Sequence, residues 1–155
     1  MRVWRLTSGR HVSFDGEGSR LAGGRWNLRR TPLVYASESL ALAALEYLVN
    51  VDPGTAPGDL VAIAAVIPDR VAIKIVSADE LPKNWRRFPA APQLAILGTN
   101  WANSLETAVL RVPSAVVPQE SNLLLNPRHP NFSKFVVRDP IPFAFDTRVW
   151  KKQRR

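Results

Sequence analysis

Apolar runs, and the alternation of apolar with polar residues, predict several short strands in the first half of the chain. VWRL at 3–6 alternates, which predicts a first strand with Arg5 on the face opposite Trp4. LVYA at 33–36 predicts a second short strand. LVAIAAVI at 60–67 is continuously apolar and contains β-branched residues, which is typical of a strand covered on both faces.

Turn residues and prolines divide the remaining strand-like segments. VAIKIV at 71–76 follows Pro68 and Asp69, so we predict that it pairs with 60–67 as a hairpin. Further short strands are predicted at 107–113, 115–118, 134–139 and 142–146.

Helical spacing predicts two longer helices. Ser37 offers an N-cap for a helix over about 38–50. Its apolar stripe is broad, so we expect a largely buried helix whose inner face contains Ala41, Ala44, Leu45 and Leu48. Pro92 suits the first turn of a second helix over 92–104.

The polar segments between these elements predict loops. Residues 7–24 contain several glycines and polar side chains, and residues 79–90 are charged, with Trp85 and the pair Arg86–Arg87 expected to be exposed to some degree. The whole pattern predicts one mixed α/β (α+β) domain with a single sheet and two main helices. A chain of 155 residues is long enough to bury the core of such a domain.

The composition narrows the chemistry. The chain has no cysteine and only two histidines, His11 and His129, so disulfides, thiol catalysis and cysteine-based zinc sites are excluded and no metal site is predicted. No apolar run is long enough to span a bilayer, and the first residues lack the apolar segment of a signal peptide. We therefore predict a cytoplasmic protein without membrane contact.

The net charge of +8, carried mostly by arginine, indicates an anionic partner such as nucleic acid, a phosphate-rich ligand or an acidic protein. Solubility alone accounts for the charge equally well, and the basic tail KKQRR at 151–155 supplies part of it. A nucleic-acid-binding module stays a remote alternative, because the chain lacks the glycine motifs and interleaved aromatics of common RNA-binding domains.

Three residues of different chemistry stand on consecutive predicted elements: Arg25 in the turn GGRWN, Tyr35 near the end of a strand, and Glu46 in the first helix. They can converge on one pocket, where a guanidinium beside a glycine turn is suited to grip a pyrophosphate. A lone carboxylate on an apolar helix either faces water or serves a site. The plainer alternatives are a surface arginine, a core tyrosine and a solvent-facing glutamate.

A second polar stretch, ESNLLLNPRHP at 120–130, contains Ser121 and Asn122. Their short side chains can bind a ribose or a phosphate, or simply cap a turn. His129 suits either a catalytic base or a plain loop residue, and we favour the loop residue.

The segments GGRWN, VYAS, ALAALE and ESNLLLNPRHP, in this order, resemble the RES domain, which occurs in the toxins of bacterial Xre–RES toxin–antitoxin pairs. Four motifs in one order are more specific than any one of them. We assign residues 1–150 to the RES domain and 151–155 to the basic tail. By motif position, the family's named arginine, glutamate and serine are similar to Arg25, Glu46 and Ser121, and its tyrosine to Tyr35; Asn27 and Asn122 lie inside the same motifs, and Arg5 in the first strand is a further candidate.

The resemblance implies a fold similar to that of ADP-ribosyltransferases and an enzyme that consumes NAD without a metal. Family members are similar to NAD glycohydrolases or phosphorylases, and some to ADP-ribosyltransferases that modify proteins. It implies that Glu46 stabilises an oxocarbenium-like ribose, that Arg25 clamps the pyrophosphate, and that Tyr35 packs at the nicotinamide end. Substrate binding is assigned also to Ser121, Asn122, Arg5 and Asn27, and the implied partner is an Xre-type antitoxin. The acceptor, whether water, phosphate or a macromolecule, stays open.

Overall fold

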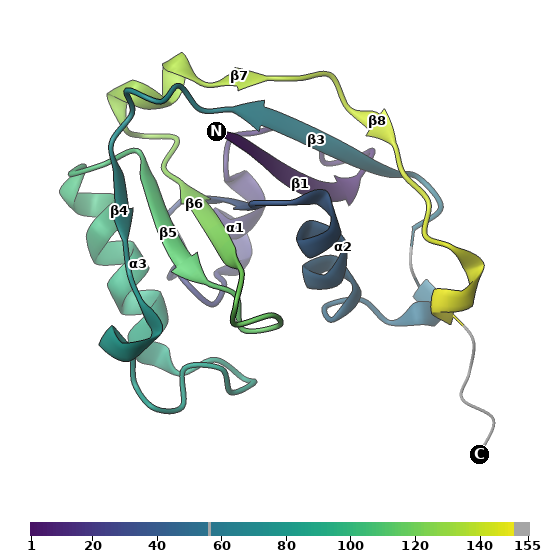
Figure 1. Cartoon of the computed structure of the whole chain (residues 1–155), viewed down its shortest axis with the longest axis horizontal. Coiled ribbons are helices and arrows are strands. Elements are labelled where there is room, and N and C mark those ends of the chain that lie inside the picture. Colours follow the sequence, from purple (N-terminus) through teal and green to yellow (C-terminus); the bar gives the residue numbers. More distant parts are fainter. Residues whose placement is uncertain (56, 151–155) are drawn as a thin grey trace.

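The computed structural model describes residues 1–55 and 57–150, and these form one mixed sheet of eight strands with helices packed against it (Figure 1). The strands run in the order β4-β5-β6-β2-β1-β3-β7, and β8 also pairs with β3. The strands are β1 (Arg2–Ser8), β2 (Val34–Ser37), β3 (Leu60–Val66), β4 (Ile73–Ile75), β5 (Val109–Pro113), β6 (Ser121–Leu125), β7 (Val136–Val137) and β8 (Ile141–Pro142). The α-helices are α1 (Glu17–Ala22), α2 (Leu40–Leu48) and α3 (Pro92–Ser104), and short 3₁₀ helices occur at Pro53–Thr55, Ala78–Glu80, Pro130–Lys134 and Thr147–Trp150. The predicted mixed α/β class with one sheet is confirmed.

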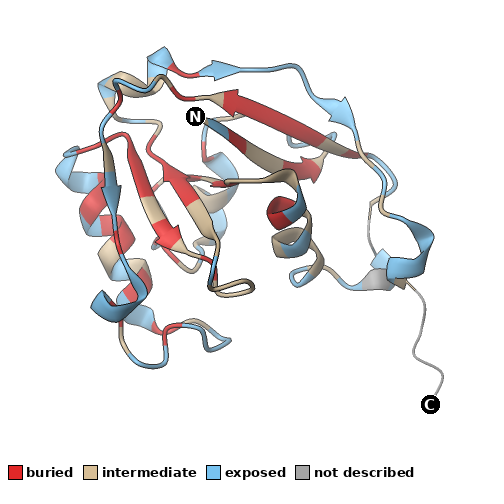
Figure 2. Ribbon diagram, in the orientation of Figure 1, coloured by how far each residue is buried: buried red, intermediate tan, exposed pale blue. Residues whose placement is uncertain are grey.

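The central strands β5 and β6 are buried on both faces, because their side chains alternate between two core clusters. Leu110 and Leu124 pack on one face with Leu94 and Trp101 of α3. Val109, Leu123 and Leu125 pack on the other face, toward Phe135 and the β1–β3 pair. In Figure 2, β5 and β6 are coloured mostly as buried or intermediate, whereas α3 alternates between buried and exposed residues.

The predicted hairpin between 60–67 and 71–76 is wrong. β4 runs parallel to β5, with Ile73 opposite Val109, whereas β3 pairs with β1, β7 and β8. Parallel neighbours need a crossover connection, and α3 provides it between β4 and β5. Pro68 and Asp69, which follow β3, therefore lead the chain to β4 at the far edge of the sheet.

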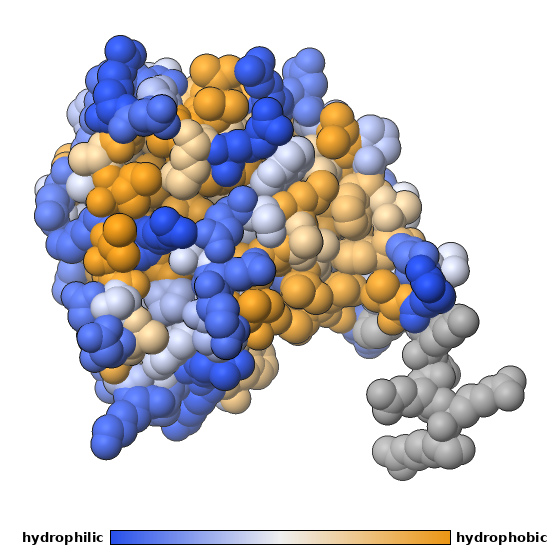
Figure 3. Space-filling model, viewed as in Figure 1, coloured by the Kyte–Doolittle hydropathy of each residue, from blue (hydrophilic) through white to orange (hydrophobic). Residues whose placement is uncertain are grey.

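Helix α2 is shorter and less buried than the sequence predicts. Its N-cap is Ser39, whose Oγ accepts the N–H of Leu42 at 3.1 Å, not Ser37. Leu42 and Ala43 are buried, while Ala41 and Leu45 of the predicted inner face are exposed. The helix is apolar nearly all round, so its hydrophobic pattern has no polar side to fix which face turns inward. An apolar area over α2 is visible on the surface in Figure 3.

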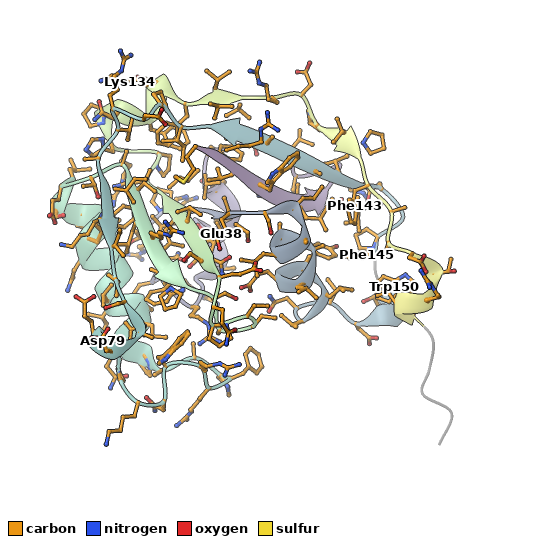
Figure 4. The ribbon with its side chains drawn as sticks, in the orientation of Figure 1. Glu38, Asp79, Lys134, Phe143, Phe145 and Trp150 are labelled. Atoms are coloured by element: carbon orange, nitrogen blue, oxygen red, sulfur yellow. The ribbon has the colours of Figure 1, made fainter. Side chains whose placement is uncertain are left out.

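Aromatic side chains of the C-terminal segment pack against α2. Phe143, Phe145 and Trp150 lie together beside the helix (Figure 4), and the rings of Phe145 and Tyr47 stack with centroids 6.4 Å apart. Leu6 of β1 belongs to the same cluster. The helix that carries Glu46 is therefore held from both the sheet and the C-terminal segment.

Four local predictions also differ from the structure. The predicted loop 7–24 contains the end of β1 and helix α1, and the predicted strand 115–118 is a turn. Only Pro142 of 142–146 lies in a strand. Trp85 is buried, because it inserts beneath α3, while Arg86 and Arg87 are exposed as expected. The tail 151–155 lies outside the described residues.

Within the described part of the chain, no helix is long and apolar enough to cross a membrane.

Candidate active site

The sheet opens between β1 and β2. β1 pairs with β3 along its whole length, from Arg2 to Ser8, but meets β2 only where Trp4 stands opposite Ser37. A cavity of about 320 Å³ lies in this gap, between β1, β2 and the inner side of α2. Its lining includes Arg5, Tyr35, Glu46, Tyr47 and Asn122.

A larger cavity of about 1000 Å³ adjoins the smaller one. It is lined by the glycine turn with Arg25, by the loop after Trp85, and by Ala115 and Val116. Tyr35, Glu46, Asn50 and Asn122 line both cavities. Glu46 therefore stands at the junction of the two cavities.

Two fixed donors hold one oxygen of Glu46. Its Oε1 accepts hydrogen bonds from Ser114 Oγ at 2.7 Å and from Asn122 Nδ2 at 2.6 Å. Ser114 Oγ in turn accepts the N–H groups of Val116 and Val117, at 3.1 and 2.9 Å, which also shapes the turn that the sequence predicts as a strand. Ser37 Oγ donates to Asn122 Oδ1 at 2.7 Å and fixes that amide. Among the described residues, both side-chain hydrogen bonds to this carboxylate go to Oε1, and Oε2 accepts neither of them.

The phenol of Tyr35 closes the glycine turn. Its hydroxyl donates to Asn27 Oδ1 at 2.6 Å and accepts the N–H of Trp26 at 3.0 Å. Burial raises the pKa of Tyr35 well above its ordinary value, so the phenol stays protonated. Asn27 is buried and donates to the backbone oxygens of Ser19 and Thr31. Asn27 therefore organises the turn, while the ring of Tyr35 faces the cavities.

Replacing Tyr35 with phenylalanine is expected to lower the free energy of unfolding by about 1–3 kcal/mol, because Asn27 Oδ1 and the N–H of Trp26 lose their buried partner. Urea denaturation measures the change. Tyr47→Phe is the matched control, since Tyr47 lines the smaller cavity but is only partly buried. Equal denaturation midpoints for Tyr35→Phe and wild type would show that the phenol oxygen does not hold the turn.

Arg25 stands at the wall of the larger cavity and is tied to the loop opposite the turn. Its Nη1 donates to the backbone oxygens of Trp85 at 2.8 Å and Arg87 at 3.2 Å. Burial lowers the pKa of Arg25, and the nearby charge of Glu46 opposes the change. The guanidinium remains charged at neutral pH, so it can meet an anion with its remaining donors.

Close backbone packing sets the position of this turn. A Cβ on Gly98 of α3 would overlap the backbone oxygen of Trp26, so only glycine permits the contact. Thr99 belongs to the same helix, and its Oγ1 accepts a hydrogen bond from the N–H of Leu28 at 2.9 Å. Helix α3 therefore fixes the backbone at Trp26 and at Leu28, next to Arg25.

Arg5 brings a positive charge to the smaller cavity, in addition to the charge of Arg25 in the larger one. Its Nη1 donates to the backbone oxygen of Ser13 at 2.7 Å. Burial lowers its pKa, and Asp15 partly compensates. Within residues 1–55 and 57–150, no group of three or more metal-binding side chains comes together.

Ser121 precedes Asn122 in β6, but among the described residues its side chain makes no hydrogen bond to Glu46. Its backbone N–H donates at 3.0 Å to Oε1 of Glu38, which is labelled in Figure 4. Glu38 Oε2 pairs with Arg111 Nη2 at 2.8 Å. Ser121 is outside the set of described residues that line the two cavities. The serine that contacts Glu46 is Ser114, which sequence reasoning missed. The available signal was a serine placed directly after a predicted strand ending in Pro113.

Fold and site together define a single-domain α/β protein with two adjoining cavities, lined by charged side chains, at an open seam of its sheet. The chain belongs to the RES domain family, whose sequence profile matches residues 2–146. The resemblance drawn from the motifs is thus confirmed over nearly the whole chain.

Several relatives share this domain. The chain is 36% identical to the "Prs ADP-ribosylating toxin" of Sphingobium sp. (strain YBL2), over 96% of each chain. It is 35% identical to "Toxin Res" of Yersinia enterocolitica, over 96% of this chain and 99% of that one. A solved structure with the same fold, titled "Crystal structure of the M.tuberculosis MbcT-MbcA toxin-antitoxin complex", aligns with a TM-score of 0.69 at 16% identity, over 92% of this chain and 84% of that one.

Proposed function

We propose that this chain is the toxin of a bacterial toxin–antitoxin pair and that it cleaves the nicotinamide–ribose bond of NAD in the cytoplasm. The observation that carries the proposal is Glu46, which stands where two cavities meet, with Oε1 held by fixed donors and Oε2 available to a ligand. The names of the Sphingobium and Yersinia relatives both support a toxin, and the name of the Sphingobium relative, an ADP-ribosylating toxin, also supports NAD as the substrate.

NAD fits the two cavities in one direction. The pyrophosphate is an anion and belongs beside Arg25, in the larger cavity. The nicotinamide ring then enters the smaller cavity, whose lining includes the aromatic side chains of Trp4 and Tyr47. This arrangement puts the nicotinamide ribose, which joins nicotinamide to the pyrophosphate, at Glu46, with the ring of Tyr35 alongside.

Cleavage needs little help for the leaving group. The C1′–N bond of NAD breaks with both electrons going to nicotinamide, which leaves as a neutral molecule, and the positive charge passes to the ribose. Glu46 stabilises this oxocarbenium-like ribose by its negative charge. Its Oε2 also accepts a hydrogen bond from a ribose hydroxyl. Water attack at C1′ then yields ADP-ribose and a proton, whereas phosphate attack yields the 1′-phosphate of ADP-ribose.

The direct test is incubation of purified protein with NAD, with and without phosphate, followed by identification of the products. Free ADP-ribose in both samples indicates a glycohydrolase, and a phosphorylated product that depends on phosphate indicates a phosphorylase. Intact NAD in both samples, with no ADP-ribose transferred to an added cell extract, would contradict the proposal.

An ADP-ribosyltransferase acting on a protein is the second candidate. The name of the Sphingobium relative, an ADP-ribosylating toxin, favours it. The same Glu46 chemistry applies, but a protein side chain replaces water at C1′. Labelled ADP-ribose attached to protein in the extract, in place of free product, would establish this candidate. A nucleic-acid-binding module would instead show binding that falls steeply with salt.

Arg25→Lys is expected to weaken NAD binding about tenfold, the scale of losing one charge-assisted hydrogen bond. Lysine keeps the charge but lacks the planar guanidinium. It therefore cannot bond the backbone oxygens of Trp85 and Arg87 and bind a phosphate at the same time in the way that arginine can. Calorimetric titration with NAD measures the loss. If lysine binds NAD as tightly as arginine, the bidentate grip is wrong and Arg25 acts as a point charge or a bystander.

The proposed antitoxin is expected to block NAD entry. Arg25 and Arg86 line the larger cavity, and Arg29 and Arg30 are exposed nearby in the sequence, so a covering segment should present acidic side chains or a chain-terminal carboxylate. The measurement is NAD binding by the purified toxin–antitoxin complex. A complex that binds NAD as tightly as free toxin, yet is inactive, would show that inhibition works by distortion rather than by occlusion.

A further inference from the structure

The loop at 85–88 displays an aromatic ring on a rigid support. Trp85 is buried in the core, and Arg25 bonds the backbone oxygens of Trp85 and Arg87. Arg86 Nε donates to the backbone oxygen of Ala115 at 3.1 Å, which ties the loop to the opposite wall. Phe88 follows these three anchored residues and is nevertheless 85% exposed. A large apolar side chain kept in water by a fixed backbone is available for a ligand.

Phe88 belongs to the larger cavity rather than to a remote surface. Ala90, Ala115 and Val116 line the same cavity and give it an apolar wall without charge. Glu46 lies in the lining where this cavity joins the smaller one, and Arg25 lies in the same lining. The larger cavity thus offers a carboxylate, a guanidinium, and an exposed ring with apolar neighbours.

We propose that Phe88 is the platform on which the adenine ring of NAD stacks. This inference rests on the proposed function. In NAD the pyrophosphate separates the nicotinamide ribose from the adenosine. Arg25, assigned to the pyrophosphate, is hydrogen-bonded to Arg87, the residue directly before Phe88. A dinucleotide that has its nicotinamide ribose at Glu46 and its pyrophosphate at Arg25 therefore brings its adenine to the loop that carries Phe88.

The stacking makes Phe88 a determinant of substrate size rather than of chemistry. Base–aromatic stacking tolerates any base, because every base has a π face. The residue should distinguish NAD from nicotinamide mononucleotide, which has the same scissile bond but lacks the adenosine. It should not affect bond cleavage, since that step is assigned to Glu46.

The experiment compares wild type, Phe88→Ala and Phe88→Trp, with Ile75→Ala as the matched control. Ile75 is 63% exposed in β4 and lies outside the residues that line the two cavities. Two quantities are measured: steady-state turnover of NAD and of nicotinamide mononucleotide, and calorimetric binding of ADP-ribose, which keeps the adenine and lacks nicotinamide. Thermal unfolding confirms that each variant is folded.

Phe88→Ala is expected to raise KM for NAD and the Kd for ADP-ribose by about tenfold to a hundredfold, the scale of losing one stacked base. Turnover of nicotinamide mononucleotide should be unchanged, Phe88→Trp should restore binding, and Ile75→Ala should resemble wild type. An equal loss for both substrates would overturn the platform and show that Phe88 only shapes the loop. Unchanged NAD kinetics in Phe88→Ala would also overturn it, whereas a wild type that leaves NAD intact and does not bind ADP-ribose would overturn the proposed function itself.

Discussion

Glu46→Gln is expected to stay folded and to bind NAD, but to turn it over about 10²–10³ times more slowly than wild type, the usual cost of losing one preorganised electrostatic partner. The surroundings dictate how the glutamine sits. Ser114 and Asn122 both donate to the Oε1 position, so the amide oxygen must occupy it. The amide nitrogen then faces the cavity, and a donor replaces the acceptor where the ribose hydroxyl and its developing charge are expected.

Single-turnover kinetics measure the rate of bond cleavage, and calorimetric titration measures NAD binding, so the two experiments separate a loss of turnover from a loss of binding. Glu106→Gln is the control, because Glu106 is a half-exposed carboxylate paired with Lys74 at 2.7 Å and stands apart from both cavities. Loss of turnover with retained binding supports a role in the transition state. Near-normal turnover by Glu46→Gln would remove Glu46 from the mechanism.

Gly98→Ala is expected to have the largest effect on stability, lowering the free energy of unfolding by about 3 kcal/mol, the upper end of the usual cost of overpacking. The added methyl overlaps the backbone oxygen of Trp26, which cannot rotate away as a flexible side chain would. Because Trp26 adjoins Arg25, NAD affinity should fall as well.

Chemical denaturation measures this loss. Gly18→Ala is the matched control: it also lies in a helix, α1, but its added Cβ meets no atom within 4 Å. Alanine in an open helical position should be neutral or stabilising, by up to about 1 kcal/mol. A Gly98→Ala protein as stable as wild type would mean that α3 and the Trp26 turn separate without cost.

The sequence predicts those parts of the fold whose signals are local. Val34–Ser37, Leu60–Val66 and α3 follow from apolar runs and from Pro92, and the family follows from motifs in order. The pairing of β4 is different, because its partner is separated from it by a whole helix. Local turn signals describe the start of a connection but not its destination.

For the site, the sequence supplied the residues more readily than their contacts. Arg25, Tyr35, Glu46 and Asn122 line the larger cavity, and Arg5 lines the smaller one. Their roles in catalysis and binding stay predictions. Ser114 was missed because a buried serine that orients a carboxylate differs from a turn serine only in its tertiary partners. The importance of Gly98 was equally hidden, since a glycine in a helix shows its close neighbour only once α3 is docked.

The single meeting point of β1 and β2, at Trp4 and Ser37, divides the sheet into two halves that lack a continuous ladder between them. Few hydrogen bonds must break for these halves to move apart, so amide protons along the seam should exchange with solvent sooner than those between β1 and β3. A molecule seated in the seam would bridge the halves and slow that exchange. Native-state hydrogen exchange can thus report occupancy of the site even in a variant that no longer performs the reaction.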